Sequence, residues 1–502
     1  MMGRGFELPP RISSASRSTS TPAKSHCYAI TAIQFLLFLM LSGCLLVGHS
    51  GRNTPDIPQD TNPASITPLP SDEITRQMFR NEYLLGDWDN ARTWLALHGI
   101  EPTALIISDP FGNLTGGQQR GATDYNLAGV DILLDTQKLF GLRGGEFHIG
   151  GAVNFGTSLS AKYIGNSFPV QLADVATSQP RLTYLSYTHL LDEGKVSFRI
   201  GRLTVNSVTD EEFMGSEYFK LLSSVGFDLI PQSLFFDANG ASGYPHTTWG
   251  TRLRYIFSDC VYVQAGAYNG DVKQRNGDQH GVDFSLRGPL FTIAELGLRW
   301  NSGPQDTGLA RNLKFGAYYN GGTYTQAKPQ TIQNVSGLYG LYFVGDQQLW
   351  HWHEDKHGPP GHPENTSYSD AQRDRHLGIF GVFTAEPQAR LNTVPYFFDG
   401  GVAAYGPSAE RPRDFAALGI VYGSFKNTPQ RLLQVTPLIA PSSNEETLEA
   451  TYGFAVRPGL LFQPSLQWMI HPRGNISIPS ALPPGSSVPN ALAFGSNIVV
   501  NF

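Results

Sequence analysis

The sequence predicts an all-β protein, a transmembrane antiparallel β-barrel of about 16 strands with a short helical segment at its N-terminal side. Beyond about residue 120, apolar and polar residues alternate with a period of two, as in strands with two different faces. Short turns such as Ser258-Asp259 alternate along the chain with long polar loops such as 269–281, an arrangement typical of membrane barrels. Tyrosine and tryptophan stand near strand ends, where membrane interfaces would lie. They are Trp249, Tyr268, Trp300 and Tyr319.

A leader precedes the barrel. Residues 28–47 form a mostly apolar stretch that follows four scattered basic residues, a pattern typical of secretory signals. We expect residues 1–50 to be a signal segment that is cleaved before Gly51. Two alternatives stay open at this point. Cys44 closes a stretch that resembles a bacterial lipobox, and the apolar stretch is also long enough to stay in a bilayer as an anchor.

The rest of the chain divides into three parts. Residues 51–80 are polar and proline-rich, and we interpret them as a flexible periplasmic linker. In 81–119, the apolar residues between Leu84 and Leu97 follow a helical spacing. Residues 120–502 leave room for the barrel at about 24 residues per strand, and a barrel of that size encloses an aqueous channel.

Composition excludes several classes of protein. Only 16% of the 502 residues are charged and the net charge is −6, which gives no case for nucleic-acid binding. Aromatic residues make up 12%, too many for a disordered chain. Two of the three cysteines lie in the leader. A mature chain that keeps only Cys260 has neither a disulfide framework nor a cysteine-based zinc site.

The C-terminal residues form a last amphipathic strand. Counting back from Phe502 in twos gives Val500, Ile498, Ser496 and Phe494, a largely apolar face opposite Asn501 and Asn497. A final strand that ends in phenylalanine resembles the signal read by the assembly machinery of bacterial outer membranes. With the leader, it places the protein in the bacterial outer membrane, in contact with lipid and, during assembly, with that machinery.

At several places the chain resembles the carbohydrate-selective porins of the OprB type. LLGDWDNARTWLALHGI (84–100) is similar to the family's opening "GDWGGxRTxLxxxGI", although Asp89-Asn90 stands where the family commonly has Gly-Gly. NLTGG, LDTQKLFGLRGGEFHI, FRIGRL with EEF, and the last strands from Tyr396 onward follow in the family's order. The resemblance implies a 16-stranded channel for passive diffusion of glucose and related saccharides, with the N-terminal segment packed against the barrel. Large porins are usually homotrimers, so we expect this assembly as well.

Charged residues on the predicted lumen face could donate to and accept from sugar hydroxyls. Six candidate pore-lining or solute-contacting residues are Arg92, Arg202, Arg254, Glu295, Arg299 and Glu449. Alternation turns Glu295, Arg299 and Glu449 inward and their neighbours Leu296, Leu298 and Ala450 toward lipid. Arg202 shares the parity of the outward Phe198, so a bulge or turn beside Gly201 would have to redirect it. The resemblance favours Arg202 near the constriction, whereas Arg92 would either reach the lumen or pair with an acid.

One short stretch of the sequence matches the pattern of a catalytic motif. His353-Glu354-Asp355-Lys356-His357 satisfies H-E-x-x-H, which binds zinc when both histidines share a helical face. Gly358-Pro359-Pro360-Gly361 follows at once and stops a helix. We therefore expect a solvated external loop, no metal, no cofactor and no enzymatic activity.

Other functions remain open from the sequence alone. The same barrel could be a general or differently selective channel, because a fold does not determine its cargo. An outer-membrane barrel enzyme would need a catalytic arrangement that the sequence does not display. A surface adhesin or structural barrel would be favoured if the lumen were plugged.

Overall fold

The structure is a computed structural model that describes residues 83–502 with internal gaps. The gaps are 175–178, 206–211, 217, 219–220, 228–230, 238, 271–279, 303–307, 329–330, 353–374, 426–443 and 476–486. The predicted leader (1–50), the linker (51–80) and the H-E-x-x-H motif therefore lie outside the described residues. Within the described part, no helix is both long and apolar enough to cross a bilayer.

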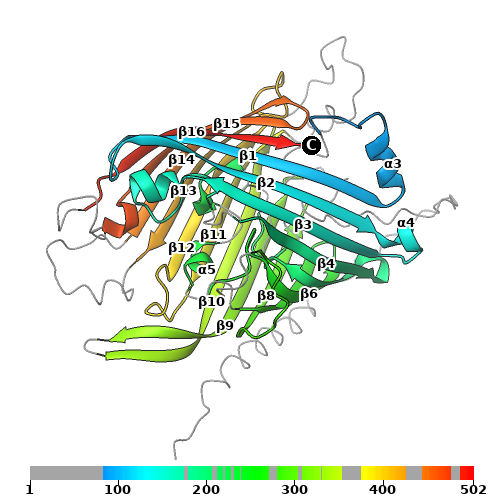
Figure 1. Cartoon of the computed structure of the whole chain (residues 1–502), viewed down its shortest axis with the longest axis horizontal. Helices are drawn as coiled ribbons and strands as arrows, with labels where there is room; N and C mark the ends of the chain where they lie inside the picture. The colour runs from blue at the N-terminus through cyan, green and yellow to red at the C-terminus, as the bar shows by residue number, and fades with distance from the viewer. Residues whose placement is uncertain are drawn as a thin grey trace, which may run out of the picture. The chain divides into compact units, whose positions relative to one another are not determined.

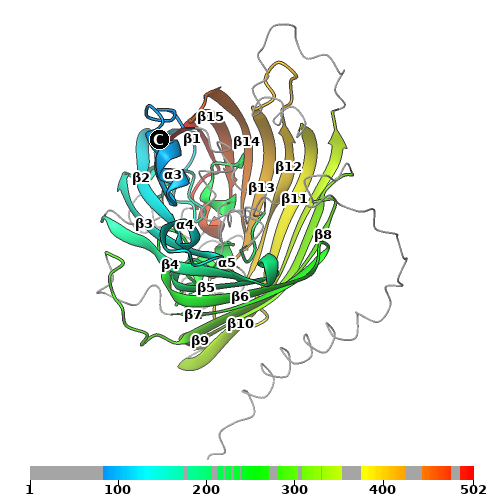
Figure 2. The ribbon, with the colours of Figure 1, turned by 90° about the vertical axis from the view of Figure 1, so that its right-hand side faces the viewer.

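Sixteen antiparallel strands close into a barrel in the described chain, as predicted (Figures 1 and 2), because β1 pairs with both β2 and β16. The strands are β1 (Ile100–Thr115), β2 (Gly121–Asp135), β3 (Gly145–Gly156), β4 (Arg181–Leu191), β5 (Val196–Leu203), β6 (Thr248–Ser258), β7 (Val261–Asn269), β8 (Leu290–Trp300), β9 (Arg311–Lys328), β10 (Thr331–His351), β11 (His376–Ala385), β12 (Tyr396–Tyr405), β13 (Phe415–Ser424), β14 (Asn444–Arg457), β15 (Leu460–Ile470) and β16 (Ala491–Asn501). The short helices are α3 (Ala91–Leu97), α4 (Thr136–Phe140) and α5 (Gln232–Phe236). Single turns of other helix types lie at η2 (Ser160–Ile164), η3 (Asp192–Gly194), η5 (Val225–Phe227) and η6 (Pro472–Asn475).

The first strand begins earlier than predicted. β1 starts at Ile100, whereas the alternation suggested strands only from about residue 120 and a helical segment over 81–119. The helix α3 ends at Leu97. Pro102, Pro110 and an uninterrupted apolar run between them hide the period of two. Pairing with both neighbouring strands, a tertiary constraint, makes this stretch a strand.

The two ends of the barrel differ. The short connections β4–β5, β6–β7 and β14–β15 lie at the end that carries the C-terminus, while 157–180, 204–247 and 270–289 connect strands at the other end. Short turns are periplasmic in such barrels, so the C-terminal end is the periplasmic one. β10 and β11, the strands on either side of 353–374, meet at this end through the pair His351–His376. The predicted external loop itself lies outside the described residues.

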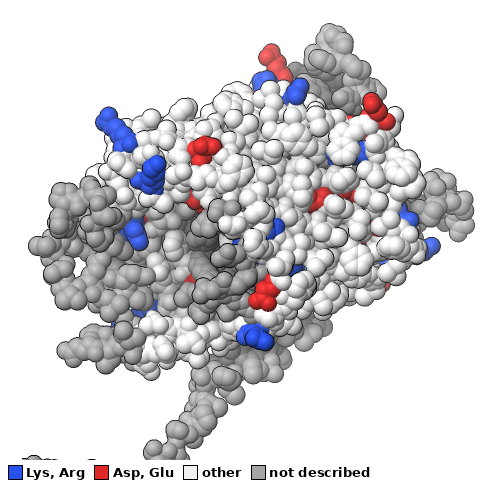
Figure 3. Space-filling view, in the orientation of Figure 1, with Lys and Arg blue, Asp and Glu red and all other residues white. Residues whose placement is uncertain are grey.

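The strands carry one apolar outer face and one buried inner face. In β8, Ile293 and Glu295 are buried and alternate with the outward Ala294 and Leu296. Large apolar residues are exposed on the outside of most strands, and uncharged residues cover most of the surface in Figure 3. This is the surface that a barrel presents to lipid.

Aromatic rings fill the inner wall over glycines of neighbouring strands. A Cβ at Gly297 would lie 2.0 Å from the ring of Tyr262, and one at Gly316 would lie 2.1 Å from the ring of Tyr342. Both tyrosines are buried. The high glycine content therefore makes space for large inward rings rather than for loops alone.

Gly297→Ala is expected to lower the free energy of unfolding by about 1–3 kcal/mol, the usual effect of overpacking a filled interior. Urea unfolding in detergent micelles, followed by tryptophan fluorescence, measures it. Gly381→Ala is the matched control, because the nearest atom to its Cβ would be the Asp399 oxygen at an ordinary 3.5 Å. Equal losses in both variants would contradict the role of the ring contact.

Candidate functional site

Parts of two long connections fold into the barrel. Phe168, from the connection 157–180, and Phe213 and Phe227, from 204–247, are fully buried and share one apolar cluster with wall residues such as Phe291 and Phe397. Figure 2 shows α5, from the second connection, inside the ring of strands. The interior is therefore partly packed, and the wall residues meet protein as well as solute.

Glu449, on β14, holds the second inserted segment. Its carboxylate accepts the backbone N–H groups of Ser223 (2.7 Å) and Ser224 (3.0 Å) and the hydroxyl of Ser465 (2.9 Å). Only 3% of the residue is exposed. Glu449 faces inward, but it is a buried anchor of the inserted segment, not the solvated lumen charge that alternation suggested.

Glu295, on β8, acts in the same way nearer the start of the segment. It accepts the N–H of Met214 (2.9 Å), the hydroxyls of Tyr262 (3.0 Å) and Tyr342 (2.9 Å), and the amide of Gln264 (2.8 Å). The residue is fully buried. Strand alternation correctly predicts that the side chain of Glu295 points inward. It does not predict the inserted segment, from a distant part of the chain, whose Met214 N–H the carboxylate accepts.

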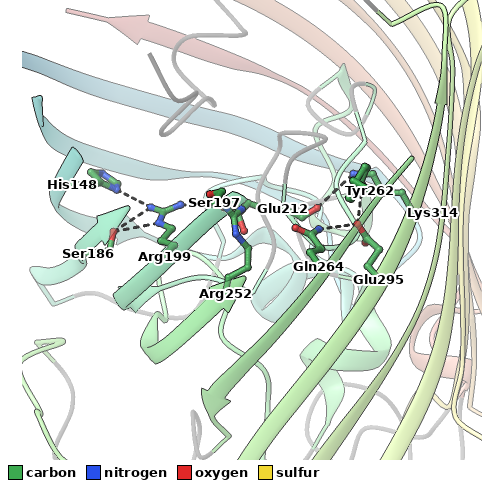
Figure 4. A network of polar contacts seen from close by, with 10 residues as sticks. All are labelled: His148, Ser186, Ser197, Arg199, Glu212, Arg252, Tyr262, Gln264, Glu295 and Lys314. Carbon is green, nitrogen blue, oxygen red and sulfur yellow. Dashed lines mark hydrogen bonds and ion pairs between the residues drawn. The ribbon is translucent and has the colours of Figure 1, made fainter. Parts of the chain in front are cut away.

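The charged centre of the wall is a carboxylate between two arginines (Figure 4). Arg199 and Arg252 lie directly opposite each other on β5 and β6. Oε1 of Glu212, from the inserted segment, lies 3.1 Å from Nη1 of Arg199 and 2.5 Å from Nη1 of Arg252. Nζ of Lys314 donates to the backbone oxygen of Glu212 at 3.5 Å. We call Arg199, Arg252 and Glu212 the arginine–glutamate cluster.

Arg254 and Arg299 extend this cationic wall. Their guanidinium groups lie over the ring of Tyr262, at 4.1 Å and 4.7 Å from its centroid, a cation–π geometry. Arg254 is buried and Arg299 is half-buried. Both face the interior, and they meet at the tyrosine that also donates to Glu295.

Arg92 and Arg202 do not join this wall. Arg92 packs between the rings of Tyr83 and Trp88, at 3.5 Å and 4.2 Å, and donates to the Pro102 oxygen at 2.7 Å. It therefore ties the N-terminal segment to β1 instead of lining the lumen. Burial lowers the pKa of its guanidinium.

Arg202 keeps the outward parity that its sequence position indicated. It pairs in register with Leu185 and Trp249, and no register shift occurs in either pairing of β5. Gly201, at φ +137°, does not redirect it. Arg202 is nevertheless 1% exposed and donates to the Thr247 oxygen at 2.6 Å. The expected place near the constriction is therefore wrong.

A further buried carboxyl group, that of Glu386, helps to hold α5 in place near the end of β11. Glu386, just after β11, accepts the hydroxyl of Tyr318 (2.7 Å) and the amide of Asn392. The same amide donates to the Ser233 oxygen in α5 at 2.7 Å. Burial, and secondarily the nearby Asp237, raises the pKa of Glu386 well above its ordinary value, which favours the neutral form at this tie.

Sequence reasoning missed the arginine–glutamate cluster as a unit. Arg199 already stood on the polar parity of its strand, and Glu212 lay in the EEF stretch that resembled the porin family. Neither signal shows that the two meet, because the connection between β5 and β6 that carries Glu212 has to fold back into the barrel before its carboxylate reaches the wall. Among the described residues, no group of three or more metal-ligating side chains is suited to hold a metal ion.

Comparison with known proteins gives consistent matches. Residues 119–502 match the family described as carbohydrate-selective porin, OprB family. A Pseudomonas aeruginosa protein named Porin B is 24% identical over 437 residues, which cover 81% of this chain and 91% of the relative. The high-pH structure of Pseudomonas putida OprB matches with a TM-score of 0.69 and 22% identity, over 84% of this chain and 98% of that one.

Glu449→Gln should loosen the inserted segment, because its new NH2 group meets backbone N–H donors where an acceptor stood. Hydrogen bonds to a charged group contribute roughly 1.5–3 kcal/mol, so amide exchange at Ser223 and Ser224 should quicken at least about tenfold. Hydrogen–deuterium exchange on the folded barrel measures this. Glu446→Gln, on the opposite face of the same strand, serves as control, and unchanged exchange in Glu449→Gln would refute the anchoring role.

Proposed function

We propose, from the premise that this chain belongs to the OprB family of carbohydrate-selective porins, that glucose and related saccharides diffuse passively past its arginine–glutamate cluster. The chain is a carbohydrate-selective porin of the bacterial outer membrane, and its family consists of channels rather than enzymes. The proposal concerns the cargo and the residues that recognise it.

The observation that supports this role is Glu212 between Arg199 and Arg252, at 3.1 Å and 2.5 Å. A sugar ring presents hydroxyls that both donate and accept, and a neutral solute needs both kinds of partner. Guanidinium groups only donate and a carboxylate only accepts. The cluster offers the two kinds side by side, on a wall that also contains the buried rings of Tyr262 and Tyr268.

The position of the cluster suits selection as well as contact. Glu212 belongs to the inserted segment, while both arginines belong to the wall. The ion pairs therefore set the distance between segment and wall, and selectivity in pores follows from width and lining groups together. Glu295 and Glu449 support this spacing by holding the segment at Met214 and at Ser223–Ser224, on the C-terminal side of Glu212.

Arg252→Gln is expected to reduce the rate of liposome swelling with glucose by up to about tenfold, the equivalent of ~1.4 kcal/mol. Salt conductance in planar bilayers should fall much less, because small ions do not need the hydroxyl contacts. Arg457→Gln, at an exposed strand end outside the lumen, should change neither. The two measurements are compared on the same purified preparations.

Equal changes in sugar flux and salt conductance would indicate that Arg252 acts on pore width alone. Equal swelling rates with sugars, amino acids and dicarboxylates of similar size would contradict sugar recognition and favour the alternative of a general or differently selective channel on the same barrel.

We further propose that Phe502 is read by the outer-membrane assembly machinery. Its backbone N–H donates to the Ala104 oxygen at 2.8 Å, next to the seam between β16 and β1. Phe502→Ala keeps this backbone bond and removes the ring. We expect a lower yield in the outer membrane of cells but unchanged refolding into detergent; equal yield in cells would count against the proposal.

The homotrimer stays a prediction. One chain closes a whole barrel and contains the entire arginine–glutamate cluster, so a trimer would hold three separate passages. Native mass spectrometry of the detergent-extracted protein distinguishes a trimer from a single chain.

A further inference from the structure

An extended segment crosses the outside of the barrel at its extracellular end. The His280 oxygen accepts the N–H of Leu182 on β4 at 2.9 Å. Phe284 then packs against Trp249 of β6 with a tilted ring, the centroids 5.3 Å apart, and the indole donates to the Asp283 oxygen at 3.0 Å. Trp249 has the outward parity of Leu253, so the segment lies on the outer face. We call residues 280–289 the outer strap.

The outer strap crosses β5 between these two contacts. Arg202 lies on β5 opposite Leu185 of β4 and Trp249 of β6, with outward parity, yet only 1% of it is exposed. A strap that runs from β4 to β6 accounts for this burial. It separates the guanidinium group from lipid, where a charge is unfavourable.

The outer strap has the reverse polarity of an ordinary surface loop. Val282, Phe284 and Leu286 are 55%, 63% and 72% exposed. The alternate residues Asp283 and Ser285 are half-buried and bonded to each other, with the Ser285 N–H 2.8 Å from the Asp283 carboxylate. Three outward apolar side chains at alternate positions of an extended backbone are unfavourable in water but suit a hydrocarbon environment.

We propose that the outer strap is a lipid-binding element, and that Val282, Phe284 and Leu286 insert among the acyl chains of the outer leaflet. The apolar face of the strap continues the lipid-facing surface of β6, where Leu253 is 51% exposed. This continuity favours membrane lipid over a soluble partner. The strap thereby extends the membrane contact of the barrel over strands β4 to β6 and covers Arg202.

The test places an environment-sensitive fluorophore (NBD) on single cysteines in a chain with Cys27, Cys44 and Cys260 replaced by serine. The labelled positions are Phe284→Cys, Leu253→Cys as the lipid-facing reference, and Thr325→Cys, exposed on the β9–β10 hairpin, as the water-facing reference. The folded full chain is placed in vesicles that contain lipids with doxyl-labelled acyl chains. We expect the label at 284 to be blue-shifted and to lose its fluorescence to doxyl lipid as fully as the label at 253.

Two outcomes would overturn the proposal. Quenching by aqueous iodide to the extent seen at 325 would place the strap in water. Protection from both quenchers, with a fall in oligomer size when Val282, Phe284 and Leu286 are all changed to serine, would show that a second copy of the chain covers it. The serine variant is tested for a closed barrel by its resistance to SDS at room temperature, so that misfolding is recognised separately.

Discussion

The interior of this barrel depends on wall carboxylates that accept backbone N–H groups from the inserted segments. Glu449 binds two such amides, Glu295 binds one, and Asp109 on β1 accepts the N–H of Ala173 at 2.7 Å. Glu445 accepts those of Ser167 and Phe168. An irregular segment inside a barrel cannot satisfy its amides by pairing with strands, and each unpaired buried N–H is costly. Carboxylates at fixed heights on a rigid wall supply the missing acceptors and so decide where the segments lie.

The site follows from this arrangement. Because the wall holds amides that follow Glu212 in the segment, at Met214 and at Ser223 and Ser224, the carboxylate of Glu212 meets Arg199 and Arg252 at a fixed place. Glutamates thus have two different roles inside the barrel. Glu295 and Glu449 have their oxygens occupied by protein donors, while Glu212 joins charges whose chemistry matches a sugar hydroxyl.

The inner and outer faces of the barrel meet different environments. Inside, glycines make room for aromatic rings, as Gly297 does for Tyr262, and polar groups find partners on the inserted segments. Outside, the surface is mostly apolar, and Arg202, which has outward parity, is buried next to Trp249, the residue that Phe284 of the strap contacts. The same period of two therefore organises a polar, partly filled interior and a lipid-facing exterior.

The sequence by itself determined the membrane barrel, its approximate strand number and the faces of residues such as Glu295 and Leu296. These features depend on the alternation of neighbouring side chains, which is a local property. Only the tertiary structure decided that β1 begins at Ile100, that Glu449 is an anchor, and that Glu212 lies between two arginines. Those outcomes depend on pairing and insertion between distant parts of the chain. A local period shows which way a side chain points but not which segment will meet it there.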